Sequence, residues 1–138
     1  MTAKFTLGIT GGLLIALLAG WIWGASGQSD TTRALQAAEL RSELLGARAA
    51  ILDARVAIYS VNFGEASAHL ENARGLLQRA IGRLTSAGRD GDVTRVQAAL
   101  TSVEDAQRMA GKLDQSANSR AGEGAKAIAA MLGAEATR

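Results

Sequence analysis

Residues 37–61, AAELRSELLGARAAILDARVAIYSV, place apolar side chains at alternating intervals of three and four. This spacing keeps one apolar stripe on a single face of an α-helix, where another helix can cover it. The pattern predicts a long amphipathic helix over about residues 31–61. Its stripe consists of Ala37, Leu40, Leu44, Ala47, Ile51, Ala54, Ile58 and Val61.

The same spacing resumes twice further along the chain. Asn-Phe-Gly at 62–64 favours a tight reversal, and a second helix is predicted over about 65–85. The loop SAGRDGD at 86–92 ends in Asp92, a good cap for a third helix over about 92–114. The second stripe is Ala66, Leu70, Ala73, Leu77, Ala80 and Leu84, and the third is Val93, Val96, Leu100, Val103, Ala110 and Leu113.

The composition favours an all-α protein, because the 138 residues include no proline and are 48% hydrophobic. Matching stripes on successive helices predict an antiparallel helical hairpin that extends to a three-helix bundle over 31–114. Residues 115–138 are polar and glycine-rich at first, so they are expected to form a tail with a short helix over 125–132.

The N-terminal region is predicted to be one transmembrane helix. Residues 5–25 contain no charged residue and would span roughly 31 Å as a helix, about the thickness of a bilayer core. Residues 1–4 precede this anchor as a short tail, and 26–30 follow it as a linker. Trp21 and Trp23 suit the membrane interface. A cleavable signal sequence is the alternative, because small residues follow the apolar run.

Small residues recur at every fourth position within this apolar segment. A row of glycine and alanine lets two membrane helices approach closely, so the row is predicted to be a helix-packing interface. Its partner is either a second copy of the chain or a different membrane protein. The row consists of Gly8, Gly12, Ala16, Gly20 and Gly24.

The charges that flank the segment suggest its orientation. Lys4 lies directly before the apolar run, whereas Arg33 is the first basic residue after it and follows Asp30. The positive-inside rule then favours a cytoplasmic N-terminus and a periplasmic C-terminal domain in a bacterial-type inner or intracytoplasmic membrane.

The composition also argues against several classes of function. A net charge of +2 provides no basic stripe for binding nucleic acid. Without cysteine, and with His69 as the single histidine, the chain offers no thiolate nucleophile and no multi-histidine metal site. We therefore expect a protein that is not an enzyme and has no cofactor.

Two groups of residues are candidates for contact with a partner. Tyr59 and Phe63 are the aromatic residues beyond the apolar segment, and they either plug the end of the bundle or form a contact patch. Arg74, Arg79 and Arg83 gather positive charge near the end of the second helix. There they either favour the helix dipole or dock an acidic partner or lipid headgroup.

The sequence FGEASAHLENA at 63–73 resembles the second helix of a tetratricopeptide repeat. An aromatic residue is followed by small, large and small residues at intervals of three, four and three. The resemblance covers only these residues, and it implies contact between proteins and no catalysis.

Together these patterns predict a non-catalytic, single-span accessory subunit of a respiratory, photosynthetic or transport complex in the membrane. Its partners would be other membrane-protein subunits and the lipid bilayer, and no nucleic acid is expected. A second copy of the chain, bound through the span, is a further candidate partner. A membrane-anchored binding or sensing module is the alternative, although few residues precede the span to carry an output signal.

Overall fold

The computed structural model describes the backbone of residues 3–136 and the side chains of residues 30–136. This part of the chain is all-helical, which confirms the prediction of an all-α protein. It contains four helices, α1 (Ala3–Tyr59), α2 (Phe63–Ser86), α3 (Asp90–Gly111) and α4 (Ala117–Ala136). The chain divides into two compact units, Met1–Ala37 and Ala38–Arg138.

Within the first unit, the backbone of α1 is helical from Ala3 onward. Among the residues whose side chains are described, no helix has the length and hydropathy needed to cross a bilayer. The predicted span over 5–25, with the tail that precedes it, lies outside those residues and stays a prediction.

The linker predicted at 26–30 is not seen, because α1 continues through it without a break. Glycine costs only about 1 kcal/mol relative to alanine inside a helix, far less than proline. The two glycines at positions 24 and 27 are therefore too weak a signal to end a helix in a chain that has no proline.

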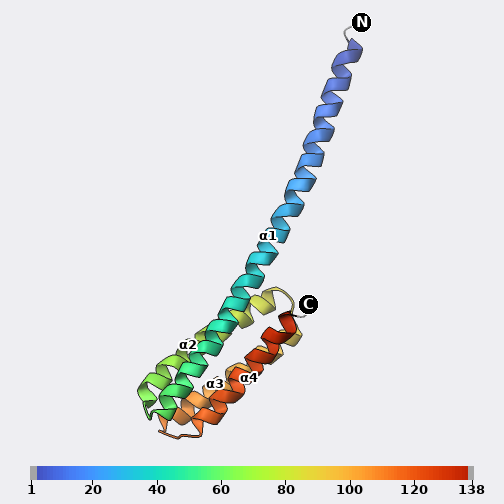
Figure 1. The fold of residues 1–138 in the computed structure, drawn as a ribbon. Coiled ribbons are helices and arrows are strands. Elements are labelled where there is room, and N and C mark those ends of the chain that lie inside the picture. The colour runs from blue at the N-terminus through green and yellow to red at the C-terminus, as the bar shows by residue number, and fades with distance from the viewer. Residues whose placement is uncertain (1–2, 137–138) are drawn as a thin grey trace. The chain divides into compact units, whose positions relative to one another are not determined.

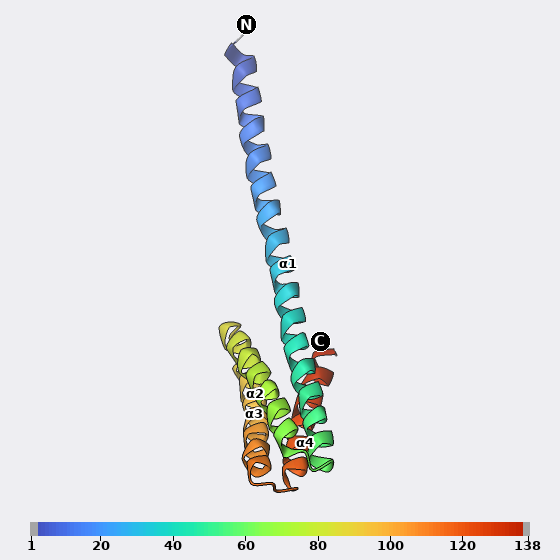
Figure 2. The same cartoon turned by 90° about the vertical axis from the view of Figure 1, so that its left-hand side faces the viewer.

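In the second unit, four helices run alternately in opposite directions (Figures 1 and 2). The part of α1 from Ala38 onward lies beside α2, where Arg83 Nε donates to Glu43 Oε2 at 3.0 Å. It also lies beside α4, where Arg55 Nε donates to Asn118 Oδ1 at 2.7 Å. α3 completes the bundle against α2 and α4.

The bundle is held together by a core of alternating large and small side chains. On α2 the large positions are Phe63, Leu70, Leu77 and Leu84, and alanines at 66, 73 and 80 lie between them. All of these residues are buried, so the predicted stripe of α2 is confirmed. Small residues that alternate with large ones let neighbouring helices interdigitate closely.

α4 is longer than the short helix predicted over 125–132, because glycines that suggested a tail lie in a packed interface. A Cβ on Gly124 would lie 3.4 Å from the Ala99 carbonyl oxygen and from a Val103 methyl group of α3. Gly122 faces the Arg55 guanidinium in the same way. These glycines let α4 pack closely against α1 and α3. The bundle therefore has α4 as a fourth helix.

The start of α3 also differs from its prediction. Arg89 occupies the N-cap position and makes no side-chain capping bond, while Asp92 lies in the first turn. Asp92 is buried and pairs with Arg89 at 2.6 Å and with Arg95 at 3.3 Å. Arg89 also reaches Glu135 of α4 at 2.9 Å. Burial opposes the charge of Arg89, but its bonds to Asp92 and Glu135 outweigh that effect and raise its pKa.

Candidate interaction surfaces

Two of the predicted contact arginines are exposed on α2 and pair with acidic residues of α1. Arg83 pairs with both Glu39 and Glu43 of α1, and Arg79 lies 3.7 Å from Glu43. The hydrogen bond to Glu43 is the main cause that raises the pKa of Arg83. Because Glu43 is buried, these arginines neutralise a carboxylate of the fold, and their contact with an acidic partner or lipid headgroup stays a prediction.

Arg74 has a different environment on the same helix. It pairs with Glu71 at 2.8 Å, one turn earlier on α2, and Glu71 also accepts a bond from Gln107 of α3. Its Nε atom is buried and has no hydrogen-bond partner among the described residues. Arg74 therefore pairs within α2, with an acidic residue that is itself bonded to α3.

The two aromatic residues that flank the first turn have opposite positions. Phe63 is buried, with 8% of its surface exposed, so of the two alternatives it follows the one in which it plugs the end of the bundle. Tyr59, the last residue of α1, is 80% exposed. The alternation of the α2 stripe reaches back to Phe63, whereas Tyr59 lies outside the inner stripe of α1.

The first turn has an unusual residue at its centre. The Val61 and Asn62 amides donate to the carbonyls of Ile58 and Ala57, which is the Schellman pattern that closes a helix. The residue at this position adopts a left-handed conformation and is usually glycine. Here it is Val61, with φ of 60°. The sequence had suggested Asn62 and Gly64 for the reversal, and Asn62 instead caps α2 by accepting from the Glu65 amide.

The end of α3 repeats this arrangement. The amides of Leu113 and Asp114 donate to the carbonyls of Ala110 and Met109, and Leu113 has φ of 58°. By contrast, Gly88 takes the equivalent position after α2, with φ of 67°. The two loops with a branched aliphatic residue lie at one end of the bundle, and the loop with glycine lies at the other (Figures 1 and 2).

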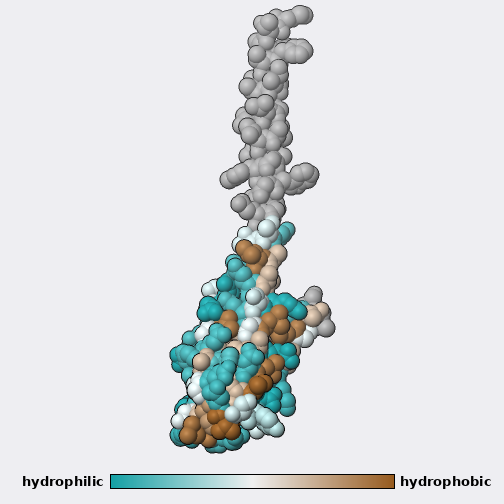
Figure 3. Space-filling model, turned by 60° about the vertical axis from the view of Figure 1, so that its left-hand side comes forward, coloured by the Kyte–Doolittle hydropathy of each residue, from teal (hydrophilic) through white to brown (hydrophobic). Residues whose placement is uncertain are grey.

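The side chains of both left-handed residues face solvent. Val61 is 63% exposed and Leu113 is 69% exposed, although both were predicted members of apolar stripes that face the core. Apolar surface is visible at this lower end of the bundle (Figure 3). We call Tyr59, Val61 and Leu113 the apolar end of the bundle.

A second apolar surface follows the outer side of α1. Leu45 and Leu52 are partly exposed, and Val56 is 67% exposed. With Ser42 and Ala49, which are also exposed, they alternate at intervals of three and four. We call these five residues the outer face of α1. Among the described residues, every large exposed hydrophobic side chain that lies within a helix belongs to α1.

Sequence reasoning missed this outer face because two apolar stripes share one helix. The inner stripe contains Leu44 and Ile51, and the outer stripe contains their neighbours Leu45 and Leu52. Both stripes have the same period, so a search for one amphipathic face stops at the first. The signal for the second stripe was the pair of leucines that directly follow Leu44 and Ile51, together with Val56 further along the same face.

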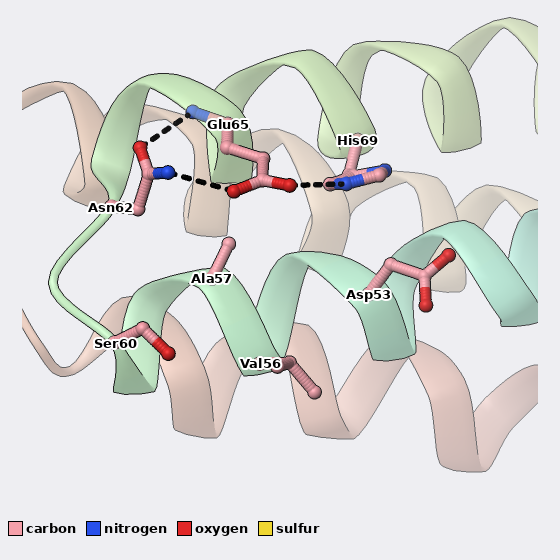
Figure 4. Close-up of a pocket in the computed structure, with 7 residues that line it drawn as sticks. All are labelled: Asp53, Val56, Ala57, Ser60, Asn62, Glu65 and His69. Carbon is pink, nitrogen blue, oxygen red and sulfur yellow. Dashed lines mark hydrogen bonds and ion pairs between the residues drawn. The ribbon is translucent and has the colours of Figure 1, made fainter.

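A shallow groove of about 330 Å³ lies where α1 ends and α2 begins (Figure 4). Asn62 Nδ2 donates to Glu65 Oε2 at 2.7 Å, and His69 Nε2 lies 3.7 Å from Glu65 Oε1. The Asp53 carboxylate projects from α1 on the other side of the groove (Figure 4). Among the described side chains, no group of three metal-binding residues gathers. The contacts of Glu65 serve the cap of α2, as in a capping box.

The predicted helix-packing row and interface anchors lie in the part of the chain whose side chains the structure does not describe. They therefore stay predictions: Gly8, Gly12, Ala16, Gly20, Gly24, Trp21 and Trp23.

No model of a known protein family matches this chain, and no match was found among curated proteins or solved structures. The tetratricopeptide resemblance of residues 63–73 also remains a prediction.

Proposed function

We propose that the protein is a non-catalytic accessory subunit of a multi-subunit membrane complex, anchored by one helix over residues 5–25. Its helical bundle would lie on the aqueous side, in the periplasm of a bacterial-type cell. The proposal combines the apolar run of the sequence with the apolar surfaces of the bundle.

The apolar end of the bundle is the observation that carries this proposal. A left-handed conformation costs a non-glycine residue roughly 1–2 kcal/mol. Val61 and Leu113 bear this cost while their side chains are mostly exposed, so the isolated bundle gains little packing in return. Strain of this kind occurs mostly at functional sites. Together with the exposed ring of Tyr59, the two side chains suit an interface with another protein.

Purification of the complex tests this proposal. The full chain is tagged, extracted from its membrane in mild detergent, and its companion chains are identified by mass spectrometry. We expect another membrane protein in fixed stoichiometry, and we expect Val61→Asn with Leu113→Asn to lose it. The matched control, Ala68→Asn with Ala98→Asn, places the same new residue at exposed positions of α2 and α3 and should retain it.

Two outcomes would contradict the proposal. One is a wild-type chain that purifies without any companion membrane protein. The other is a double asparagine variant at the apolar end that keeps its companion as well as the control does, because that end would then not be the contact.

The predicted row of small residues has its own test. Gly12→Leu with Gly20→Leu should release the subunit from its complex while it still enters the membrane, because leucine holds the two helices apart. Full retention of the companion chain would count against the row as the contact. The matched control is Leu13→Ile with Leu17→Ile, which leaves the row unchanged.

A further inference from the structure

We propose that two copies of this chain associate in parallel along the outer face of α1, through a short coiled coil. The inference does not depend on docking at the apolar end, because it uses different residues. It begins from the period of the outer face, whose positions 42, 45, 49, 52 and 56 alternate between intervals of three and four.

This alternation is the repeat by which two helices pack along a common seam. Small or β-branched residues, Ser42, Ala49 and Val56, take one set of positions, and Leu45 and Leu52 take the other. Val56 is the β-branched residue of the first set, and a β-branched residue there with leucine at the second set favours a parallel dimer. A polar serine in the seam is also compatible with a dimer that has a fixed register.

The charges beside the seam identify a second copy as the partner. Arg41, Arg48 and Arg55 border one side of the outer face at intervals of seven, and Asp53 borders the other side. Arg55 is engaged by Asn118, whereas Arg48 and Asp53 are exposed and pair with no other described residue. Among the described residues, each copy therefore offers the cations Arg41 and Arg48 on one side of the stripe and the anion Asp53 on the other, without a partner in the bundle.

Helix direction decides whether these charges meet. In a parallel pair, a residue on one flank of the seam contacts a residue of the partner helix that lies on the other flank. The partner residue is the one five positions later in the sequence. Arg48 would then meet Asp53 of the second copy, and the two-fold symmetry repeats this ion pair. In an antiparallel pair, the arginine row would face itself. The charges favour the parallel arrangement.

A flat membrane surface is the competing occupant of this face, because Arg41 and Arg48 could approach anionic lipid. The two occupants predict opposite effects of charge at position 53. Asp53→Arg removes the ion pair between copies, but it adds a cation that anionic lipid would attract.

Charge exchange in the full chain tests the proposal, with self-association measured by analytical ultracentrifugation in detergent. Each single reversal, Arg48→Glu or Asp53→Arg, replaces two attractive pairs by two repulsive ones. We expect each to weaken the dimer about tenfold, given the modest strength of exposed ion pairs. The double variant Arg48→Glu with Asp53→Arg restores opposite charges between copies and should recover the dimer. Lys126→Glu on α4 and Glu104→Arg on α3, each made singly, produce the same two changes in net charge and are the controls.

Vesicles of phosphatidylserine and phosphatidylcholine provide the second arm, with vesicle binding measured for the same variants. We expect the Asp53→Arg variant to form a weaker dimer. We expect the double variant Arg48→Glu with Asp53→Arg to keep the dimer. The proposal is overturned if the wild-type chain does not self-associate, if the double variant fails to recover, or if Asp53→Arg strengthens vesicle binding while self-association is unchanged.

Discussion

α1 and α2 have similar inner faces and very different outer faces. Both bury alternating large and small side chains, such as Ile51 and Ala54 on α1 and Leu77 and Ala80 on α2. The outer side of α2 carries no large exposed hydrophobic residue among those described, whereas that of α1 carries Leu45, Leu52 and Val56. The bundle needs only the inner faces, so the second apolar face of α1 is available for another interaction.

The largest expected effect separates the inner from the outer leucines. Leu77→Ala should lower the free energy of unfolding by about 2–5 kcal/mol, because it leaves a cavity at a fully buried position. Leu45→Ala should change it by less than about 1 kcal/mol, because Leu45 is 44% exposed. Urea unfolding of the full chain in dilute solution measures both.

Self-association of the same two variants sharpens this result. Leu45→Ala should weaken it, although the fold is intact. If Leu45→Ala destabilised the fold as much as Leu77→Ala does, the outer face of α1 would be part of the core after all.

The alanines provide the converse test, with a somewhat smaller effect. Ala73→Leu inserts three carbon atoms into the buried stripe of α2, and we expect a loss of about 1–3 kcal/mol in unfolding free energy. Ala49→Leu places the same side chain on the exposed outer face of α1 and should leave that free energy nearly unchanged. Thermal and urea unfolding compare the two variants. Equal losses would mean that position 49 is packed in the fold.

The stripes that bind the four helices together were largely visible in the sequence. All six positions predicted on α2 are buried, because their three-and-four spacing continues without exception. The prediction failed at stripe ends: Val61 and Leu113 continue the spacing but lie beyond the helices that carry it. Periodicity identifies which face is apolar, but it does not identify the residue at which the backbone turns.

Glycine misled the prediction in two places. The glycines before Asp30 suggested a linker that α1 passes through, and Gly122 and Gly124 suggested a tail that is part of α4. A glycine that breaks a helix and a glycine that lets a second helix approach look alike in one sequence. Only the neighbouring Ala99 and Val103, which are distant in the chain, distinguish the two.

The candidate surfaces were less predictable than the fold. Tyr59 and Phe63 were expected to share one role, either a plug or a contact patch, but Tyr59 is exposed and Phe63 is buried. The partners of Arg83 on α1 depend on the way the two helices face each other, which spacing along one helix does not show.

Relief of strain at the apolar end should give a smaller effect, in the stabilising direction. Asparagine tolerates a left-handed backbone better than valine, so Val61→Asn should raise the unfolding free energy by about 1 kcal/mol. That corresponds to several degrees in Tm for a bundle of this size. Calorimetry of the full chain measures the shift. A lower Tm would show that the exposed Val61 side chain stabilises the fold itself.

The smallest expected effect is on the pH dependence of the unfolding free energy. The Ser116 backbone amide donates to Asp114 Oδ1 at 2.8 Å, and this bond is the main cause that lowers the pKa of Asp114 from 3.8. A carboxylate whose pKa is lower in the folded state stabilises the fold at a pH above its ordinary pKa. That contribution is lost as the pH falls through the pKa of the folded state. Wild type and Asp114→Ala should therefore differ slightly above pH 3.8, and the difference should vanish as the pH falls through the lowered folded pKa. A difference that persists in acid would exclude the charge as its cause.

Cysteine cross-linking tests the contrast between α1 and α2 most directly, because the chain has no cysteine of its own. Leu45→Cys and Leu52→Cys are each made in the full chain and exposed to a mild oxidant, with Gln78→Cys on the outer side of α2 as the matched control. Parallel pairing brings each cysteine close to the same cysteine of the second copy. Both α1 variants should therefore form disulfide-linked dimers, and the α2 variant should not. Monomers from both α1 variants, or dimers that form equally well through position 78, would contradict the account.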